Sequence, residues 1–217
     1  YDDALMGVGA AQPVVTEPDN YLAEFLMKRE GTPQDAIADV GSGVDENGVG
    51  YGHLATDADK RLWATLDPEQ RKLKAQEWLR QDIEKATKGA DKQIAKLGRS
   101  LSSENAQGFK DMLTFMNFQL GNEWHTKKFK KAWSGLKQGN KKGSTGMFRG
   151  KTGWEQAVYH LMHVNESSNK PSKWLLQTPT RVMDAVMAIH YMSNGQGTED
   201  IIGYIDSILK IGSQMLS

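Results

Sequence analysis

The chain has 217 residues and a mass of 24.1 kDa, which is enough for one well-buried core divided into two lobes around a cleft. Its 38% apolar and 25% charged residues are typical of a soluble globular protein, and the absence of cysteine excludes disulfides and thiolate metal sites. No apolar run approaches the roughly 20 residues needed to span a bilayer. Residues 4–15 lack a basic flank and contain Pro13, so we expect neither an integral membrane segment nor a signal peptide.

The formal net charge is zero, but the charges are unevenly distributed. Residues 1–60 contain twelve acidic and three basic residues, whereas residues 127–151 contain nine basic residues and no acidic one. A basic segment favours an anionic partner such as peptidoglycan, anionic lipid or nucleic acid. A solvated helix face followed by a loop explains the same segment, and the sequence leaves both readings open.

The first predicted element is a short helix over residues 20–29, in which Leu22, Phe25 and Leu26 recur at helical spacing. A glycine and a proline follow it and leave Glu30 at its C-terminus. Residues 36–53 are rich in glycine and alternate small with apolar residues, which predicts a small sheet of two or three short strands.

Helical patterns dominate after Asp57. Asp67 and Pro68 form a cap and a first-turn proline that open a helix to about residue 88, and this helix is long enough to join two lobes. Its predicted inner face carries Leu73, Trp78, Leu79 and Ile83.

Further helices are predicted over residues 103–120, 127–137, 154–164, 178–192 and 198–215. The first of them has an apolar stripe from Phe109 to Leu120 and is closed by Gly121. The last is amphipathic, with isoleucines along one stripe. A glycine-rich basic loop spans residues 138–153.

These elements predict an α+β, mostly α fold, with a small glycine-rich β-hairpin lobe and a larger helical lobe joined by a long helix. We expect a partly extended N-terminal lead over residues 1–19 and one domain over residues 20–197. Within that domain the small lobe covers about 31–66 and the helical lobe about 89–197. An additional amphipathic helix covers residues 198–217.

Two carboxylates are the strongest candidates for catalysis. The sequence lacks a phosphate-binding glycine motif, a histidine pair with a third metal ligand and a serine nucleophile elbow. Glu30, beside an apolar wall at a helix C-terminus, is expected to have a raised pKa and to act as a general acid. Asp39, in a polar turn, is expected to remain ionised as a base or an electrostatic stabiliser. Such a pair suits glycoside hydrolysis, by inversion at a separation of roughly 6.5–9.5 Å or by retention at roughly 5–5.5 Å.

Three separated motifs then occur in a definite order. They are Glu30-Gly31 with Asp39 and Val49-Gly50-Tyr51-Gly52-His53-Leu54, then Phe118-Gln119-Leu120-Gly121, and finally Gln177-Thr178-Pro179-Thr180-Arg181. Together they resemble the active-site signature of phage-type lysozymes, glycoside hydrolase family 24. The resemblance covers roughly residues 21–192.

The resemblance implies a lysozyme-like fold and a muramidase that hydrolyses the β-1,4 bond between N-acetylmuramic acid and N-acetylglucosamine in peptidoglycan, without a cofactor or a metal. Glu30 matches the family's proton donor, and Asp39 matches the carboxylate that positions the attacking water, so inversion is expected. Arg181 matches the arginine that pairs with the catalytic glutamate, and His53 matches a histidine in a structural ion pair. The positions that line the saccharide cleft are matched by Leu54, Phe118 and Gln119.

The hairpin departs from the family pattern. The family places a threonine six residues after its aspartate, and this count reaches Asp45, whereas counting back from the Gly50 motif reaches Gly48. Ser42, Asp45 or Asn47 are the alternatives for the missing contact, and Asp45 is an alternative to Asp39 as the base. The departure leaves open a weakened, wall-binding or structural virion domain.

The resemblance further implies a bacteriophage protein that acts on the periplasmic cell wall, either as an endolysin released from the host cytoplasm or as a bacteriolytic module of the virion. Peptidoglycan glycan strands are the expected partner, and residues 198–217 are the expected contact with other virion proteins. A nucleic-acid-binding module would rest on the basic segment alone. That segment lacks interleaved aromatic residues, so we expect no nucleic-acid partner.

Overall fold

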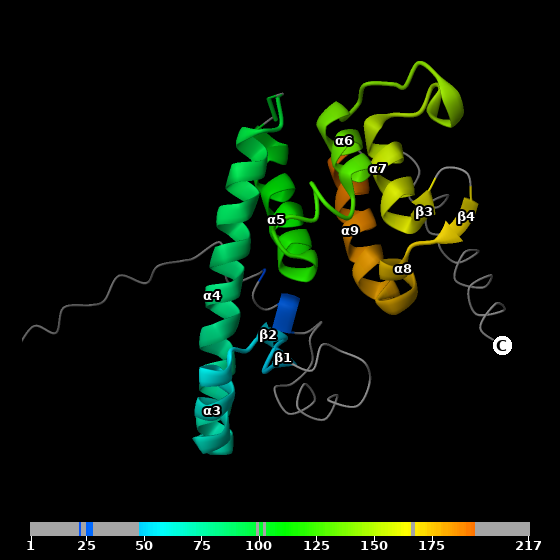
Figure 1. The fold of residues 1–217 in the computed structure, drawn as a ribbon. Coiled ribbons are helices and arrows are strands. Elements are labelled where there is room, and N and C mark those ends of the chain that lie inside the picture. Colours follow the sequence, from blue (N-terminus) through cyan, green and yellow to red (C-terminus); the bar gives the residue numbers. More distant parts are fainter. Residues whose placement is uncertain are drawn as a thin grey trace, which may run out of the picture.

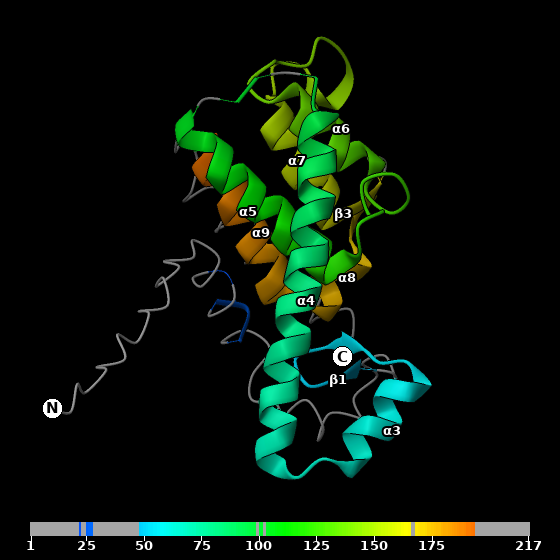
Figure 2. The ribbon, with the colours of Figure 1, turned by 90° about the vertical axis from the view of Figure 1, so that its left-hand side faces the viewer.

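Helix α4 (Pro68–Ala95) is the axis of the molecule and connects two lobes (Figure 1). The computed structural model describes residues 22, 25–27, 48–98, 100, 101, 103–165 and 168–193. The hairpin lobe, residues 48–66, lies at the N-terminal end of α4, and the helical lobe, residues 103–193, lies along its C-terminal part (Figures 1 and 2). The described chain is mostly helical with two small antiparallel sheets, which confirms the predicted α+β, mostly α fold class.

The hairpin lobe contains strands β1 (Gly48–Val49) and β2 (His53–Leu54) and helix α3 (Asp57–Thr65). Short strands were predicted here, and the described pair is antiparallel. Residues 36–47, the remainder of the predicted sheet region, lie outside the described residues.

The start of α4 follows from its sequence. The Asp67 carboxylate accepts a hydrogen bond from the Gln70 N–H at 2.9 Å, and the Gln70 side chain accepts one from the Asp67 N–H at 3.1 Å. The helix then continues seven residues beyond the predicted end, to Ala95. Its buried face carries Ala75, Trp78, Leu79, Ile83, Ala86 and Ala90.

Leu73 was predicted on this face and the prediction is wrong, because its side chain is 66% exposed. At 100° per residue, Leu73 lies about 120° around the helix from Leu79, outside the buried stripe.

The helical lobe is built around α5 (Ser103–Leu120), which has the predicted bounds. The predicted apolar stripe of α5 is buried at Phe109, Met112, Leu113 and Met116, and this face packs between α4 and α9 (Pro179–Met192). Gly121, with φ of +78°, follows the last residue of the helix, as predicted.

Helices α6 (Lys130–Gln138) and α7 (Gly153–Met162) pack closely against each other. Gly135 and Gly153 permit this approach, because a Cβ atom on either would overlap the carbonyl oxygen of the other. Between the two helices, the basic loop contains a short 3-10 helix, η2 (Gly146–Phe148).

The last part of the described chain differs from the prediction in its details. Helix α7 ends at Met162, and the next residues form β3 (His163–Asn165), which pairs with β4 (Ser168–Pro171). The short helix α8 (Lys173–Gln177), which was not predicted, then precedes α9. The predicted N-terminal lead and the helix predicted over 198–215 lie outside the described residues.

None of the helices in the described part of the chain combines the length and the apolarity needed to cross a membrane.

Candidate active site

The hairpin turn is fixed by two glycines. Strands β1 and β2 pair Gly48 with Leu54 and Val49 with His53, so residues 50–52 form the loop. Gly50 and Gly52 have φ values of +63° and +83°, a region that residues with a Cβ atom rarely adopt. A Cβ atom on Gly50 would also lie 2.9 Å from the Cβ atom of Ala75 in α4. The glycines therefore allow the turn to form and to pack directly on the connecting helix.

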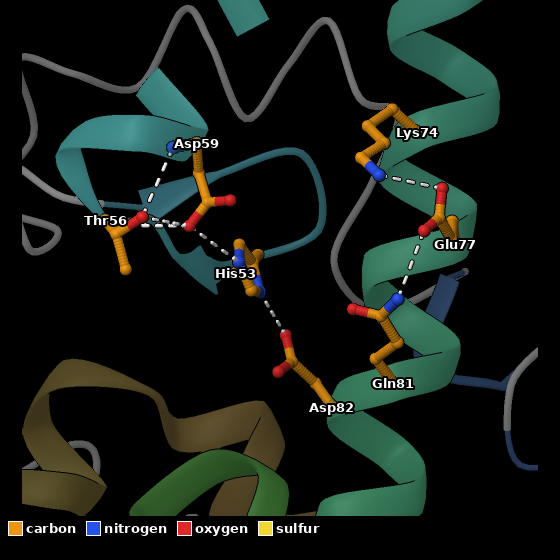
Figure 3. A network of polar contacts seen from close by, with 7 residues as sticks. All are labelled: His53, Thr56, Asp59, Lys74, Glu77, Gln81 and Asp82. Carbon is orange, nitrogen blue, oxygen red and sulfur yellow. Dashed lines mark hydrogen bonds and ion pairs between the residues drawn. The ribbon is translucent and has the colours of Figure 1, made fainter. Parts of the chain in front are cut away.

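His53 fastens the hairpin to α4 (Figure 3). Its Nδ1–H donates to Oδ2 of Asp82 at 2.8 Å, and its Nε2 lies 3.8 Å from Oδ2 of Asp59. Its ring stacks on Trp78 with centroids 4.7 Å apart and planes 12° apart. The side chain of His53 in β2 thus contacts both α3 and α4. The resemblance implies a structural ion pair for this histidine, and the contact with Asp82 is a pair of that kind.

Asp59 belongs to the capping box of α3. Its carboxylate accepts hydrogen bonds from the Thr56 hydroxyl at 2.6 Å and from the Thr56 N–H at 2.9 Å, while the Thr56 oxygen accepts from the Asp59 N–H at 3.2 Å (Figure 3). The Thr56 hydroxyl bond, followed by the backbone bond, lowers the pKa of Asp59 below its usual range. Asp59 therefore remains ionised beside His53 at neutral pH.

A second set of polar contacts runs along α4 (Figure 3). Lys74 Nζ lies 2.9 Å from Glu77, whose other oxygen accepts from the Gln81 amide at 3.1 Å. Lys74 also lies 5.6 Å from the centroid of Trp78, the ring on which His53 stacks. Exposed ion pairs of this kind contribute little stability.

The helical lobe contains a pocket of about 770 Å³. It is bounded by the C-terminal end of α5, residues 127–132, β3, α8 and the first turn of α9. In both ribbon views the end of α5 and the α8–α9 junction lie on the side of the helical lobe that faces the hairpin (Figures 1 and 2). We call this cavity the basic pocket, because five lysines and an arginine line it: Lys127, Lys128, Lys130, Lys131, Lys173 and Arg181.

The structure brings two of the predicted site residues together. Gln119 at the end of α5 and Arg181 in the first turn of α9 both line the basic pocket. Phe118 is partly buried against the core and is not among the lining residues. Leu54 lies in β2 with 67% of its side chain exposed, and it is not among the residues that line the pocket.

The predicted catalytic residues and their alternatives fall outside the described residues: Glu30, Asp39, Ser42, Asp45 and Asn47. The nearest described residues before Glu30 are Leu26, which is fully buried, and Met27. The ring of Phe25 packs edge-on against Phe115 of α5 with centroids 6.0 Å apart. This short helix is therefore docked on α5, one turn before Gln119.

The pocket also has an aromatic and a histidine wall, which are not among the predicted site residues. Trp174 and Phe129 contact each other with ring centroids 5.7 Å apart. His163 stacks on Tyr159 at 4.1 Å, and its Nδ1–H donates to the Tyr159 carbonyl oxygen at 2.9 Å. Burial lowers the pKa of His163 below its ordinary value, which favours the neutral ring. The signals for this wall in the sequence are the suitability of tryptophan faces for sugar rings and the closeness of Trp174 to the Gln177 motif.

Among the residues described, no three acidic or histidine side chains gather in a way that would hold a metal ion. Comparisons of the chain with protein-family models, with curated proteins and with solved structures give no match.

Proposed function

We propose that the chain is a peptidoglycan muramidase that hydrolyses the β-1,4 bond between N-acetylmuramic acid and N-acetylglucosamine. One observation carries the proposal: Gln119 and Arg181, which belong to separate motifs of the lysozyme-like signature, line the same pocket. Convergence of distant motif residues on one cavity is expected of a binding site.

The hairpin supports the same function. The glycines of the first motif form the turn that packs on α4, and the histidine of that motif ties the strand to Asp82. A rigid hairpin is needed if a carboxylate carried by the preceding segment is to be held opposite the acid. These features support a structural role for the glycines and the histidine of the motif. In the proposal, the carboxylates carry out the chemistry.

Glu30 is the proposed proton donor to the glycosidic oxygen. It follows Met27 by three residues, a distance of at most about 11 Å along an extended chain. Phe25 is docked on Phe115 of α5, one helical turn before Gln119, and the proposal places the Glu30 carboxyl near Gln119 and Arg181. A cation at Arg181 would counteract the rise in the pKa of Glu30 that an apolar wall produces, and would hold the carboxyl in place.

Asp39 is the proposed base, which positions a water molecule on the opposite face of the sugar. Inversion then requires a gap of roughly 6.5–9.5 Å between the two carboxyls. Because the family threonine is replaced, Asp45, Ser42 and Asn47 remain alternatives for holding the water.

Clearing of chloroform-treated Gram-negative cells tests the acid. The wild type should clear the suspension, and Glu30→Gln should clear it about 10²–10⁴-fold more slowly, because this factor is the usual contribution of a general acid. Glu69→Gln is the matched control, because Glu69 is an exposed glutamate in the first turn of α4. Equal clearing by the wild type and Glu30→Gln would reject the assignment.

A second comparison tests the base. Asp39→Asn should cost more activity than Asp45→Asn, and the reverse order would assign the base to Asp45. Analysis of the product anomer by NMR should show inversion, and retention of the β-anomer would contradict the mechanism.

The missing threonine favours one other candidate function, a non-catalytic wall-binding or structural virion domain. That candidate predicts binding to insoluble peptidoglycan without clearing by the wild type. In either case we propose a phage-encoded protein that acts on the cell wall of the host.

A further inference from the structure

The turn that follows α5 is docked on the C-terminal half of α4 through polar side chains. The Asn122 side-chain amide donates to the Lys85 carbonyl oxygen at 3.3 Å. A Cβ atom on Gly89 would lie 2.6 Å from the Asn122 side-chain oxygen, so the turn lies directly against the helix. Gln93, one helical turn further along α4, is 2% exposed and contacts the same turn. Because Gln93 is shielded from water, its amide must find its hydrogen-bond partners within the protein.

The Gln93 amide nitrogen is surrounded by acceptors. It lies 2.9 Å from Oδ1 of Asn117, 3.3 Å from the Asn122 carbonyl oxygen and 2.9 Å from Nδ1 of His125. Among the described residues, the Gln93 side-chain oxygen has no hydrogen-bond partner. A rotation of the amide by 180° does not correct this, because the oxygen atoms of Asn117 and Asn122 would then face another oxygen.

The orientation of Asn117 is fixed independently. Its amide nitrogen donates to the Ala86 carbonyl oxygen at 2.9 Å, and its oxygen accepts from the Trp124 indole at 2.9 Å. An indole N–H only donates and a carbonyl oxygen only accepts, so both bonds would be lost if the Asn117 amide were rotated. Gln93 must therefore present its nitrogen to Asn117 and, in the same orientation, to Nδ1 of His125.

This orientation determines the protonation state of His125. Because Nδ1 faces a donor, it is the unprotonated nitrogen of a neutral ring that carries its proton on Nε2. A proton added at Nδ1 would place two N–H groups 2.9 Å apart. It would also attract the side-chain oxygen of Gln93, so the amide would turn its nitrogen away from Asn117. Protonation of the ring therefore breaks a hydrogen bond between α4 and α5.

The groups around the His125 ring favour its neutral form. Burial is the largest cause and lowers the pKa of His125 below its ordinary value, whereas a hydrogen bond to the Asn122 backbone raises it. Of the charged groups nearby, Lys96 at the C-cap of α4 lowers the pKa and Glu123 in the same turn raises it. Trp133 of α6 faces the ring with centroids 5.3 Å apart and carries no charge. The ring is therefore neutral in neutral solution and takes up a proton only in acid.

We propose that His125 is an acid-sensitive switch at the junction of α4 and α5: the neutral ring accepts from Gln93 and keeps the junction closed, and the protonated ring displaces the Gln93 amide and loosens it. Asn117, which loses its bond to Gln93, lies two residues before Gln119, and Gln119 lines the basic pocket. If the chain has the proposed function, acid should therefore lower its rate of glycan hydrolysis. The switch itself does not depend on that function.

NMR spectra of the indole N–H of Trp124 at pH 7.5 and 5.5 test the switch, because this group donates to Asn117. Its signal should shift as His125 takes up a proton. His125→Gln should abolish this shift, because an amide has no proton to take up in this pH range. At pH 5.5 the indole proton of the wild type should exchange with water about two- to tenfold faster than that of His125→Gln, the effect of losing one hydrogen bond. At pH 7.5 the two proteins should exchange alike.

His163→Gln is the matched control. His163 is also a buried histidine whose pKa is lowered by burial, but its Nδ1–H donates to the Tyr159 carbonyl oxygen of α7. This variant should keep the pH-dependent shift at Trp124. A Trp124 signal that is the same at both pH values in the wild type, a shift that persists in His125→Gln, or a shift that is lost in His163→Gln would overturn the inference.

Gln93→Met keeps the test decisive if His125→Gln does not fold. It removes the donor that faces Nδ1 and retains a side chain of similar length. The His125 ring should then titrate at a higher pH than in the wild type, because the hydrogen bond that favours its neutral form is gone. An unchanged or lower titration midpoint would contradict the switch, whereas a purely structural role for Gln93 would leave the midpoint where it is.

Clearing of chloroform-treated cells at the two pH values separates the switch from the proposed function. His125→Gln should retain a larger fraction of its pH 7.5 rate at pH 5.5 than the wild type does. An equal fraction would refute the transmission of the switch to the pocket. If the wild type clears at neither pH, the muramidase proposal fails, and the NMR titration alone decides whether His125 is a switch.

Discussion

Asn117 is the residue whose removal should most disturb the junction between α4 and α5. It is 3% exposed, and its amide makes three hydrogen bonds of 2.9 Å. It donates to the Ala86 carbonyl oxygen of α4, and its oxygen accepts from Gln93 and from the Trp124 indole. Asn117→Ala removes all three bonds at once, next to the Phe118-Gln119 motif.

The magnitude follows from what each partner retains. The Trp124 N–H is left buried without its acceptor, which costs about 1–3 kcal/mol. Gln93 keeps contacts of 3.3 Å with the Asn122 carbonyl oxygen and 2.9 Å with His125, so losing its hydrogen bond to Asn117 costs about 0.5–1.5 kcal/mol. The Ala86 oxygen can still accept an intrahelical bond, and alanine's better helix propensity returns about 0.5 kcal/mol. The net loss is about 1–4 kcal/mol of unfolding free energy.

A second tryptophan provides the control. The Trp154 indole donates to Asn140 at 2.8 Å, but Asn140 is an exposed residue of a turn, and water can replace it. Asn140→Ala should therefore cost about 0.5–1 kcal/mol. Urea unfolding followed by tryptophan fluorescence and far-UV circular dichroism measures both variants. Equal losses, or a loss under 1 kcal/mol for Asn117→Ala, would refute the reasoning.

Two further predictions concern the hairpin turn and pH. Gly50→Ala places a side chain at a left-handed φ and 2.9 Å from the Cβ atom of Ala75, so it should cost about 2–4 kcal/mol of unfolding free energy in urea. Gly121→Ala has a left-handed φ but meets no neighbour within 4 Å, so it should cost about 1–2 kcal/mol. Equal losses would contradict the packing argument. Burial lowers the pKa values of His125 and His163 below 6.5, so the unfolded chain binds more protons and unfolding free energy should fall as pH drops below about 6.5. Unfolding curves at pH 7.5 and 5.5 test this, and higher stability at pH 5.5 would contradict it.

The helices were predictable where local signals agreed with the tertiary contacts. An apolar stripe closed by a glycine set the bounds of α5, and a capping box set the start of α4. The prediction failed at Leu73, because this apolar residue near the N-terminal end of α4 lies outside the stripe that the helix buries. It also failed for β3–β4, because residues 163–171 do not alternate in polarity although they form a local antiparallel pair.

The candidate site was predictable only as separate motifs. The sequence around Arg181 and around Gln119 does not indicate that the two residues share a cavity. That expectation came only from the order of the motifs along the chain. The convergence of Lys173 with the lysines of residues 127–131 depends on the packing of α6 against α7 and of α8 after β4, so spacing could not reveal it. The charge of the segment was visible in the sequence, whereas the pocket it lines was not.

Identification of the new reducing ends in digested peptidoglycan tests the central claim most directly. After reduction with borohydride and acid hydrolysis, the wild type and Glu69→Gln should release reduced muramic acid at the same rate, and Glu30→Gln should release it about 10²–10⁴ more slowly. Reduced glucosamine in its place, or an unchanged rate for Glu30→Gln, would contradict the account.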